Sequence, residues 1–185
     1  MNRRKLLKSV ALVCSVPLAS PLRLFATSGN ASEDIAAMQR RWRQLFPKSQ
    51  TVVEAQPAIE KSLEVWKKGL PQDAFEVLFE EDTERPFTSA LNEEKRPGVF
   101  VCRACDLALF TSEMKYDSGT GWPSFFTAIS GHLATKTDYK LIWPRTEYHC
   151  VKCGGHQGHI FDDGPAPTRE RWCNNGVALR FLPNS

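Results

Sequence analysis

The 185-residue sequence has no internal repeat, no low-complexity tract and no large excess of either charge. Lysine and arginine number 24 against 21 acidic residues, so the formal net charge is only +3. Five of the basic residues stand in the first 31 positions, where no acidic residue occurs, so the rest of the chain is close to neutral. A near-neutral domain lacks the positive surface that nucleic-acid binding requires, and no nucleic-acid partner is expected.

A long uninterrupted apolar run is also missing. The most apolar segment, residues 6–26, is broken by two basic residues and two prolines, which makes it a poor membrane span. Its basic start and small-residue end are typical of an export signal. NRRKLLK, residues 2–8, resembles a twin-arginine signal, with a general secretory signal or an uncleaved anchor as alternatives. We therefore expect residues 1–31 to direct export, to the periplasm for instance, and to provide the only membrane contact.

Three segments after this signal carry helical patterns. Residues 32–46 have acidic residues in the first turn and apolar residues three or four apart, and residues 57–70 repeat that spacing. Pro57 suits a first helical turn, and residues 71–84 again begin with a proline. The pattern predicts a helical N-terminal arm over residues 32–84, packed on the core. A clamp around a partner is the alternative.

After Pro97 the chain consists of short β-branched and aromatic segments separated by Gly, Asp, Ser and Pro clusters. This texture is typical of short antiparallel strands with long functional loops. It predicts a mainly β domain over residues 85–185. The candidate strands are residues 99–102, 108–110, 140–143 and 177–181.

Two C-x-x-C pairs stand in this domain, Cys102 with Cys105 and Cys150 with Cys153, with 44 residues between the pairs. Each pair can supply two thiolates from one tight turn, and two such pairs predict a structural tetrahedral Zn²⁺ site. Two disulfides are the alternative in an exported protein. Because twin-arginine export moves folded proteins, zinc could be loaded before the thiols meet an oxidising compartment.

Two of the six cysteines lie outside the C-x-x-C pairs. Because Cys14 falls in the predicted signal, Cys173 is the only spare thiol expected in the mature chain. Three long stretches around it resemble the signature segments of the B-type methionine-(R)-sulfoxide reductases. These stretches are DSGTGWPSFF (117–126), CGGHQGHIFDDGP (153–165) and RWCNN (171–175). The resemblance runs from about Trp66 to the C-terminus. It implies a β domain of two small antiparallel sheets (a β-tent fold) with one structural zinc ion.

The types of residue in these stretches are also those that reduction of a sulfoxide requires. A thiolate is the soft nucleophile that a sulfoxide sulfur requires, and Cys173 would become a sulfenic acid after the attack. In a strand, Arg171 and Asn175 share a face with Cys173, so Arg171 is expected to lower the thiol pKa and Asn175 to hold substrate or water. His156 or His159 would protonate the departing oxygen, and the sequence does not decide which.

The resemblance also implies a substrate site. Trp122 is expected to receive the S-methyl group on its flat face and so to select one epimer. Phe125 follows it in the same loop and is a further candidate substrate contact, although either this residue or Phe126 is expected to pack in the core. Asp162 or Asp163 is expected to orient a catalytic histidine.

One position departs from the family pattern. Many relatives carry a second, resolving cysteine, some of them at the position of Thr120. We therefore expect a one-cysteine cycle in which a small thiol or a thioredoxin-like protein reduces Cys173, with oxidised proteins as substrates. Two other readings stay open at this point. One is a zinc-stabilised binding module without catalysis, and the other is a thiol oxidoreductase that uses a C-x-x-C pair as its redox centre.

Overall fold

The computed structural model describes residues 30–140 and 143–184, so all but the last residues of the predicted export signal lie outside it. Within the described part of the chain, no helix is long and apolar enough to cross a membrane. The helices are α1 (Asn30–Arg40), α2 (Leu63–Gly69) and α3 (Gln72–Glu80), with 3₁₀ turns η1 (Arg41–Gln44), η2 (Ala90–Asn92), η3 (Ser112–Met114) and η4 (Gly176–Ala178). The strands are β1 (Gly98–Cys102), β2 (Ala108–Thr111), β3 (Lys115–Tyr116), β4 (Ser124–Phe125), β5 (Leu133–Asp138), β6 (Arg145–Cys150), β7 (His156–Phe161), β8 (Arg171–Asn174) and β9 (Leu179–Pro183).

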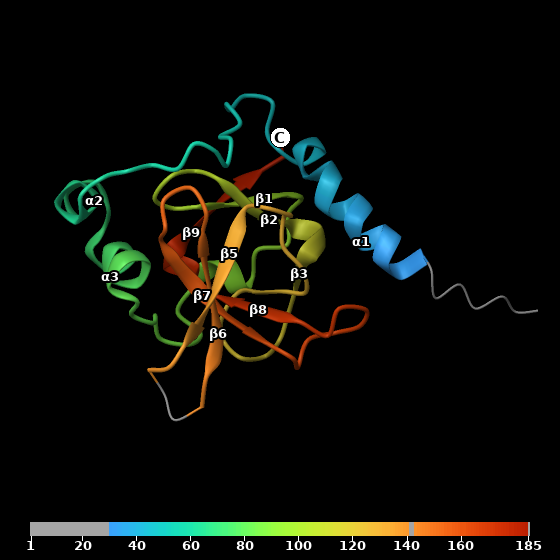
Figure 1. The fold of residues 1–185 in the computed structure, drawn as a ribbon. Coiled ribbons are helices and arrows are strands. Elements are labelled where there is room, and N and C mark those ends of the chain that lie inside the picture. Colours follow the sequence, from blue (N-terminus) through green and yellow to red (C-terminus); the bar gives the residue numbers. More distant parts are fainter. Residues whose placement is uncertain (1–29, 141–142, 185) are drawn as a thin grey trace, which may run out of the picture.

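The strands form two antiparallel sheets, which confirms the predicted mainly β architecture (Figure 1). The smaller sheet has the order β2-β1-β9, and the larger one has the order β3-β4-β8-β7-β6-β5. In the larger sheet, Cys173 on β8 lies opposite Ser124 on one side and opposite His159 on the other. The register therefore places the spare thiol and one of the two candidate histidines side by side.

The core is aromatic and lies where the two sheets meet. Phe100, Phe110 and Phe125 are completely buried, and the rings of Phe110 and Phe125 stack with centroids 4.0 Å apart. Every residue of β1 and β2 is buried, which is why their sequences are continuous apolar runs rather than alternating ones. Each such ring contributes roughly 1.5–3 kcal/mol through burial.

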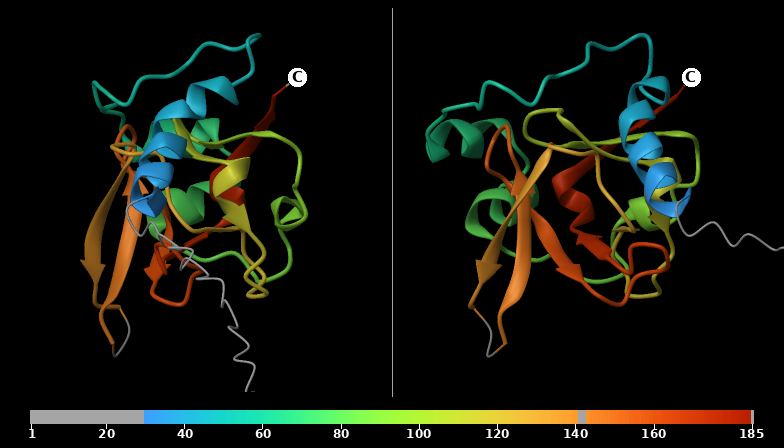
Figure 2. Two further views of the ribbon diagram at one scale, coloured as in Figure 1. Left: turned by 90° about the vertical axis from the view of Figure 1, so that its right-hand side faces the viewer. Right: turned by 45° about the vertical axis from the view of Figure 1, so that its right-hand side comes forward.

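The N-terminal arm wraps around this core, as the helical patterns predicted. Figure 1 shows α1 on one side of the sheets and α2 with α3 on the other, joined by an extended segment, and Figure 2 shows the same arrangement from two further directions. Trp42 packs edge-on against His132, with ring centroids 5.4 Å apart. Helix α3 buries Ala74, Phe75, Val77 and Leu78, the apolar stripe of an amphipathic helix.

The helix predicted over residues 57–70 is shorter than expected, because α2 begins only at Leu63. Pro57 is therefore not in a first helical turn. The preceding residues are extended and bind the second C-x-x-C segment instead. The backbone N–H of Ile59 donates to the carbonyl of Lys152 at 2.6 Å, and the Lys152 amine donates to the carbonyl of Pro57 at 3.0 Å. Tertiary hydrogen bonds thus override the helical periodicity here.

Two of the four predicted strands also differ. The strand predicted over residues 140–143 is wrong at Lys140 and Trp143, the two of its residues that the structure describes. Both lie in the connection between β5 and β6. Pro144 follows directly, and β6 begins after it at Arg145. The predicted strand 177–181 begins two residues late, because its first residues belong to η4. The remaining two predictions are confirmed by β1 and β2.

Candidate active site

A cavity of about 130 Å³ opens over the middle of the larger sheet, where β7 and β8 run side by side. Strand β8 brings Cys173 to it, and β7 brings His159. Gly158 permits the close approach of the two strands, because a Cβ at this position would lie only 1.9 Å from the carbonyl oxygen of Cys173. The residues that line the cavity are Thr83, Trp122, Arg145, Gly158, His159, Phe161, Cys173, Asn174 and Asn175.

The pKa of Cys173 differs from the lowered value that the sequence predicted. Its partial burial raises the pKa of the Cys173 thiol above the usual value, and this effect outweighs the opposing effects of Arg171 and of the Thr120 hydroxyl. Arg171 does lower the pKa of Cys173, as the sequence predicted, but burial raises this pKa by more. A thiol in this state can act as a nucleophile only after it has lost its proton.

Arg171 is held by Asp163 in a two-pronged ion pair. Its Nε lies 2.7 Å from one carboxylate oxygen and its terminal nitrogen 2.9 Å from the other. The guanidinium also lies 4.2 Å from the centre of the Phe161 ring, a cation–π contact with a wall of the cavity. Asp163 therefore positions the arginine, whereas the sequence suggested that it might orient a histidine.

The carboxylate that orients a cavity histidine is Asp138, which comes from the last position of β5. His159 Nε2 lies 2.8 Å from the Asp138 carboxylate, which also accepts a hydrogen bond from Arg145 at 2.6 Å. Burial lowers the pKa of His159, and the contact with Asp138 only partly opposes this. The imidazole is thus mainly neutral near pH 7. With Nε2 bound to Asp138, its other nitrogen is left for the cavity.

His156 is buried and does not line the cavity. Its side chain is 3% exposed, and its Nδ1 lies 3.0 Å from the carboxylate of Glu147, although not in the orientation of a regular hydrogen bond. The ring centres of His156 and His159 are 5.4 Å apart. Between the two histidines that the sequence left open, the geometry brings only His159 to the thiol.

Trp122 forms a wall of the cavity, and the end of the arm holds it in place. Its indole N–H donates to the carbonyl of Glu84 at 3.1 Å. The Glu84 backbone N–H donates to the side-chain oxygen of Asn175 at 3.1 Å, and the Glu84 carboxylate accepts the backbone N–H groups of Gly176 and Val177. A single residue thus joins the tryptophan to the loop after β8.

Asn175 lines the cavity, but its side-chain amide is already engaged. The Nδ2 group donates to the carbonyl of Gln157 at 3.1 Å, while Oδ1 accepts from Glu84. The residue is buried and fixes the shape of the cavity more than it offers a free hydrogen-bonding group. Two other predicted contacts are not brought to the cavity. Phe125 is fully buried in the aromatic core, and Asp162 is exposed in a separate depression.

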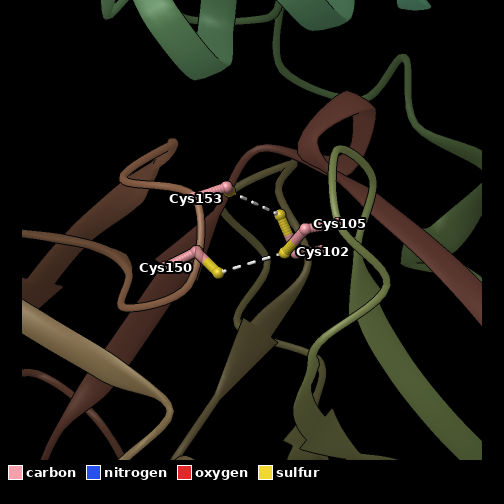
Figure 3. A group of neighbouring side chains, drawn as sticks. All are labelled: Cys102, Cys105, Cys150 and Cys153. Carbon is pink, nitrogen blue, oxygen red and sulfur yellow. Dashed lines mark hydrogen bonds between the residues drawn. The ribbon is translucent and has the colours of Figure 1, made fainter. Parts of the chain in front are cut away.

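The four cysteines of the two C-x-x-C pairs meet at the end of the sheets (Figure 3). Their sulfur atoms all lie within 4.8 Å of one another. Cys102 and Cys153 are 3.6 Å apart and Cys105 and Cys150 are 3.5 Å apart, far beyond a disulfide length of about 2.05 Å. All five cysteines of the described residues are free thiols, so the two-disulfide alternative is not realised there.

This sulfur cluster suits a zinc ion. The three neighbouring sulfurs, and after them burial, raise the pKa of Cys102, because a thiolate there would face other sulfur charges. A cation at the centre removes that penalty, and four thiolates around one ion form a common structural zinc site. Gln157 Nε2 donates a hydrogen bond to the Cys102 sulfur at 3.4 Å, and such a bond stabilises a metal-bound thiolate.

Comparison with known protein families identifies the family of the chain. The family model of the SelR domain matches residues 70–183, which include both C-x-x-C pairs, the cavity residues and α3. The chain belongs to the SelR domain family. The match begins within the segment predicted as the arm, at the start of the α3 helix that packs against β7 and η4.

Relatives of this SelR protein carry consistent names. A "Peptide methionine sulfoxide reductase MsrB" of Methanosarcina barkeri is 48% identical over 128 residues, covering 69% of this chain and 90% of the relative. The protein of the same name from Pseudomonas putida is 47% identical, covering 68% and 95%. The "Peptide methionine sulfoxide reductase B1, chloroplastic" of Arabidopsis thaliana is 44% identical, covering 73% and 68%. A solved Mis18 "Yippee-like" domain resembles 49% of this chain and 99% of its own at a TM-score of 0.39 and 16% identity, too distant to inform on function.

Sequence reasoning missed several residues of the SelR site. Asp138, Arg145 and Glu147 come from strands β5 and β6, outside the three signature stretches, and Glu84 comes from the end of the arm. The signal available for them was weak. Asp138 and Glu147 are acidic residues within strand-like segments, and such residues are buried only when they have a partner.

Proposed function

We propose that this chain reduces methionine-(R)-sulfoxide in proteins to methionine, with Cys173 as the nucleophile. The observation that carries this proposal is the pairing of Cys173 with His159 in one cavity whose wall is Trp122. Membership of the SelR family and relatives named methionine sulfoxide reductases support it. A non-catalytic zinc module would have no use for a thiol that faces an oriented imidazole.

The protonation states found in the cavity suit this reaction. Cys173 has a raised pKa and His159 a lowered one, so the pair rests as a thiol and a neutral imidazole. As the sulfur of Cys173 attacks the sulfoxide sulfur, His159 can take the thiol proton and deliver it to the sulfoxide oxygen. The products are a thioether and a cysteine sulfenic acid. All atoms of the thiol and the sulfoxide are conserved, and the cysteine supplies both electrons.

Trp122 provides the epimer selection in this scheme. Its ring is fixed through the hydrogen bond to Glu84, so the S-methyl group can lie on a flat apolar surface of fixed orientation. With the methyl group on the tryptophan and the sulfur at Cys173, only one epimer directs its oxygen toward His159. We assign this as the R epimer on the family resemblance.

The sulfenic acid is reduced by an external thiol in the cycle that we propose. The four other cysteines of the described residues are gathered in the sulfur cluster, and a threonine stands at position 120. A small thiol or a thioredoxin-like protein would form a mixed disulfide with Cys173 and then release it. Mass spectrometry of the oxidised mature protein should find a sulfenic acid, and an internal disulfide to Cys173 would contradict this cycle.

Zinc would be held by Cys102, Cys105, Cys150 and Cys153 in a purely structural role. When bound, it ties the β1–β2 turn to the β6–β7 turn and supplies no Lewis-acid chemistry to the cavity. The proposal predicts one zinc ion per chain and one thiol that reacts under native conditions. A C-x-x-C pair that oxidises reversibly, with loss of zinc, would favour the thiol oxidoreductase alternative.

Export through the twin-arginine route is a further part of the proposal, motivated by NRRKLLK at the N-terminus and by thiols that need metal before export. Replacing Arg3 and Arg4 together by lysine should leave the protein in the cytoplasm, and fractionation of cells measures this. Unchanged export of the double variant would refute the twin-arginine route.

The decisive test is turnover of a peptide that contains either epimer of methionine sulfoxide. The R form should be reduced with dithiothreitol as the electron donor, and the S form should not. Cys173→Ser should reduce R turnover by roughly a thousand-fold or more, since a hydroxyl is a much poorer nucleophile than a thiol at this pH. Retained activity in this variant, with zinc content and folding unchanged, would disprove the proposed function.

A further inference from the structure

Trp122 lines a second depression as well as the cavity. This depression has a volume of about 240 Å³ and lies between residues 87–93, which follow the arm, and the loop after β3. A methionine sulfoxide side chain can enter the cavity beside Cys173, but the peptide backbone that carries it has to stay outside. The residues that flank the oxidised methionine therefore lie on the surface next to Trp122, where the second depression is found.

Phe87, at the edge of this depression, is held in an unfavourable state. Its side chain is 72% exposed, and its φ of 64° lies in the left-handed region that disfavours residues with a Cβ. The backbone is fixed there because the Phe87 N–H donates to the carbonyl of Gly121 at 2.7 Å. Gly121 allows this close approach, since a Cβ on it would lie 2.8 Å from the Phe87 nitrogen. An aromatic ring that is displayed in this way adds little to the core and suits recognition.

The charges around the depression indicate what it recognises. Two exposed carboxylates, Glu93 and Asp117, line it together with the ring of Phe87, and of the two Glu93 already lies 3.9 Å from the amine of Lys95. The only lysine that lines it, Lys115, turns its amine to the backbone carbonyl of Asn92 at 2.7 Å. An exposed ring face and carboxylates complement a side chain with an apolar stem and a cationic end. Glutamate and aspartate would be repelled.

We propose that this depression is a subsite for a lysine or arginine that flanks the oxidised methionine in protein substrates. The inference rests on the proposed function, because the cavity has to accept methionine sulfoxide. It adds a sequence preference that the catalytic residues do not explain. Contact of the flanking lysine or arginine with Phe87 and Asp117 produces this sequence preference. Neither residue touches the reacting atoms.

The test compares peptides that contain methionine-(R)-sulfoxide next to lysine, alanine or glutamate, with the variable residue placed before or after the methionine. N-acetylmethionine sulfoxide methylamide, which has no flanking side chain, serves as the reference substrate. In one of the two positions, kcat/KM should be about five-fold higher for lysine than for alanine, the scale of one exposed cation–π contact with a nearby carboxylate. Glutamate should fall below alanine, and added salt should reduce both differences.

Three variants locate the subsite. Phe87→Gly adopts the left-handed backbone without strain, so the fold is kept while the ring is lost, and the lysine preference should disappear. Phe87→Tyr keeps the ring and should keep the preference. Asp117→Asn should weaken it by about half. All three should turn over the methylamide reference at the rate of the unaltered protein.

The outcomes separate the two proposals. No turnover of the methylamide or of any peptide by the unaltered protein would refute the proposed function itself. Normal turnover with equal kcat/KM for lysine, alanine and glutamate at both positions would overturn only the subsite. A lysine preference that survives Phe87→Gly would also overturn the subsite, since the preference would then arise elsewhere.

Discussion

The five cysteines of the described chain occupy two regions that treat the same chemical group in opposite ways. In the sulfur cluster, Cys102 and Cys150 are completely buried, and each sulfur lies within 4.8 Å of the three others. In the cavity, Cys173 stands alone, partly exposed, opposite a histidine. In the function that we propose, the cluster needs a cation to carry four thiolates, whereas the cavity needs a proton acceptor to create one thiolate at the moment of attack.

The two regions also differ in what holds them. The cluster is assembled from two tight turns, and the arm contacts one of these through Ile59 and Lys152. The cavity is assembled from side-chain contacts among distant segments, such as Asp138 with His159 and Glu84 with Asn175. A change in the cluster should therefore act mainly on stability, and a change in the cavity mainly on turnover.

The largest expected effect comes from breaking the cluster. Cys102→Ser removes one of four ligands and leaves a buried hydroxyl among sulfurs, so the free energy of unfolding should fall by about 5 kcal/mol. Calorimetry and zinc analysis measure this, with Cys173→Ser as the matched cysteine-to-serine control. If both variants were equally stable and both kept zinc, the distinction between the two regions would be lost.

A smaller effect on turnover is expected at the carboxylate that orients the histidine. Asp138→Asn should lower kcat/KM by about 10- to 100-fold, part of the 10²–10⁴ that acid–base catalysis contributes. Because contact with Asp138 raises the pKa of His159 against the effect of burial, its loss should lower that pKa further. The acidic limb of the pH profile should therefore move to lower pH.

The matched control for this variant is Asp162→Asn, because this carboxylate follows β7, is exposed and lies outside the cavity. It should leave both kcat/KM and the pH profile unchanged. An equal loss in the two variants, or an acidic limb that does not move in Asp138→Asn, would show that Asp138 does not act through His159.

The state of the spare thiol can be read from its reaction with iodoacetamide. Burial raises the pKa of Cys173, so the rate of alkylation should still be rising at pH 9, where an exposed cysteine approaches its plateau. Arg171 opposes this shift, and Arg171→Gln should slow alkylation further, by roughly three- to ten-fold at pH 8. A plateau that is reached below pH 8 would mean that the arginine dominates over burial.

The smallest effect is expected where the arm meets the cluster. Lys152→Ala removes an exposed hydrogen bond to the carbonyl of Pro57, which contributes about 1 kcal/mol or less to stability. Activity should be unchanged, and zinc release to a chelator should be slightly faster. Lys48→Ala, at an exposed lysine of the arm that is far from Lys152 in the sequence, is the control. Loss of activity in Lys152→Ala alone would show that the arm supports the cavity rather than the cluster.

Much of the sulfur chemistry was predictable from the sequence, because spacing carries it. The C-x-x-C pairs predicted a shared metal site, and the four sulfurs do meet. Cys173 and His159 were both marked by the signature stretches, and the register of β7 and β8 places them opposite each other. Local patterns suffice when the residues of a site follow one another in one or two strands.

The rest depended on which segments meet in three dimensions. Asp138 reaches His159 only because β5, β6 and β7 are neighbours in the sheet, and Asp162 is nearer in sequence but points elsewhere. The raised pKa of Cys173 depends on burial, which a charge pattern does not reveal. Residues 57–62 have a helical pattern, but Pro57 and Ile59 form hydrogen bonds with Lys152 in the second C-x-x-C segment. These tertiary hydrogen bonds decide the conformation of the segment.

Gln157 joins the two regions within a single residue. Its side chain reaches Cys102, and its backbone carbonyl receives both the N–H and the side-chain amide of Asn175. Whatever opens the sulfur cluster, whether heat, a chelator or an oxidant, also loosens the floor under the reacting thiol. A molecule that has lost its metal should therefore unfold more readily, and its activity should fall in proportion to the fraction that is unfolded.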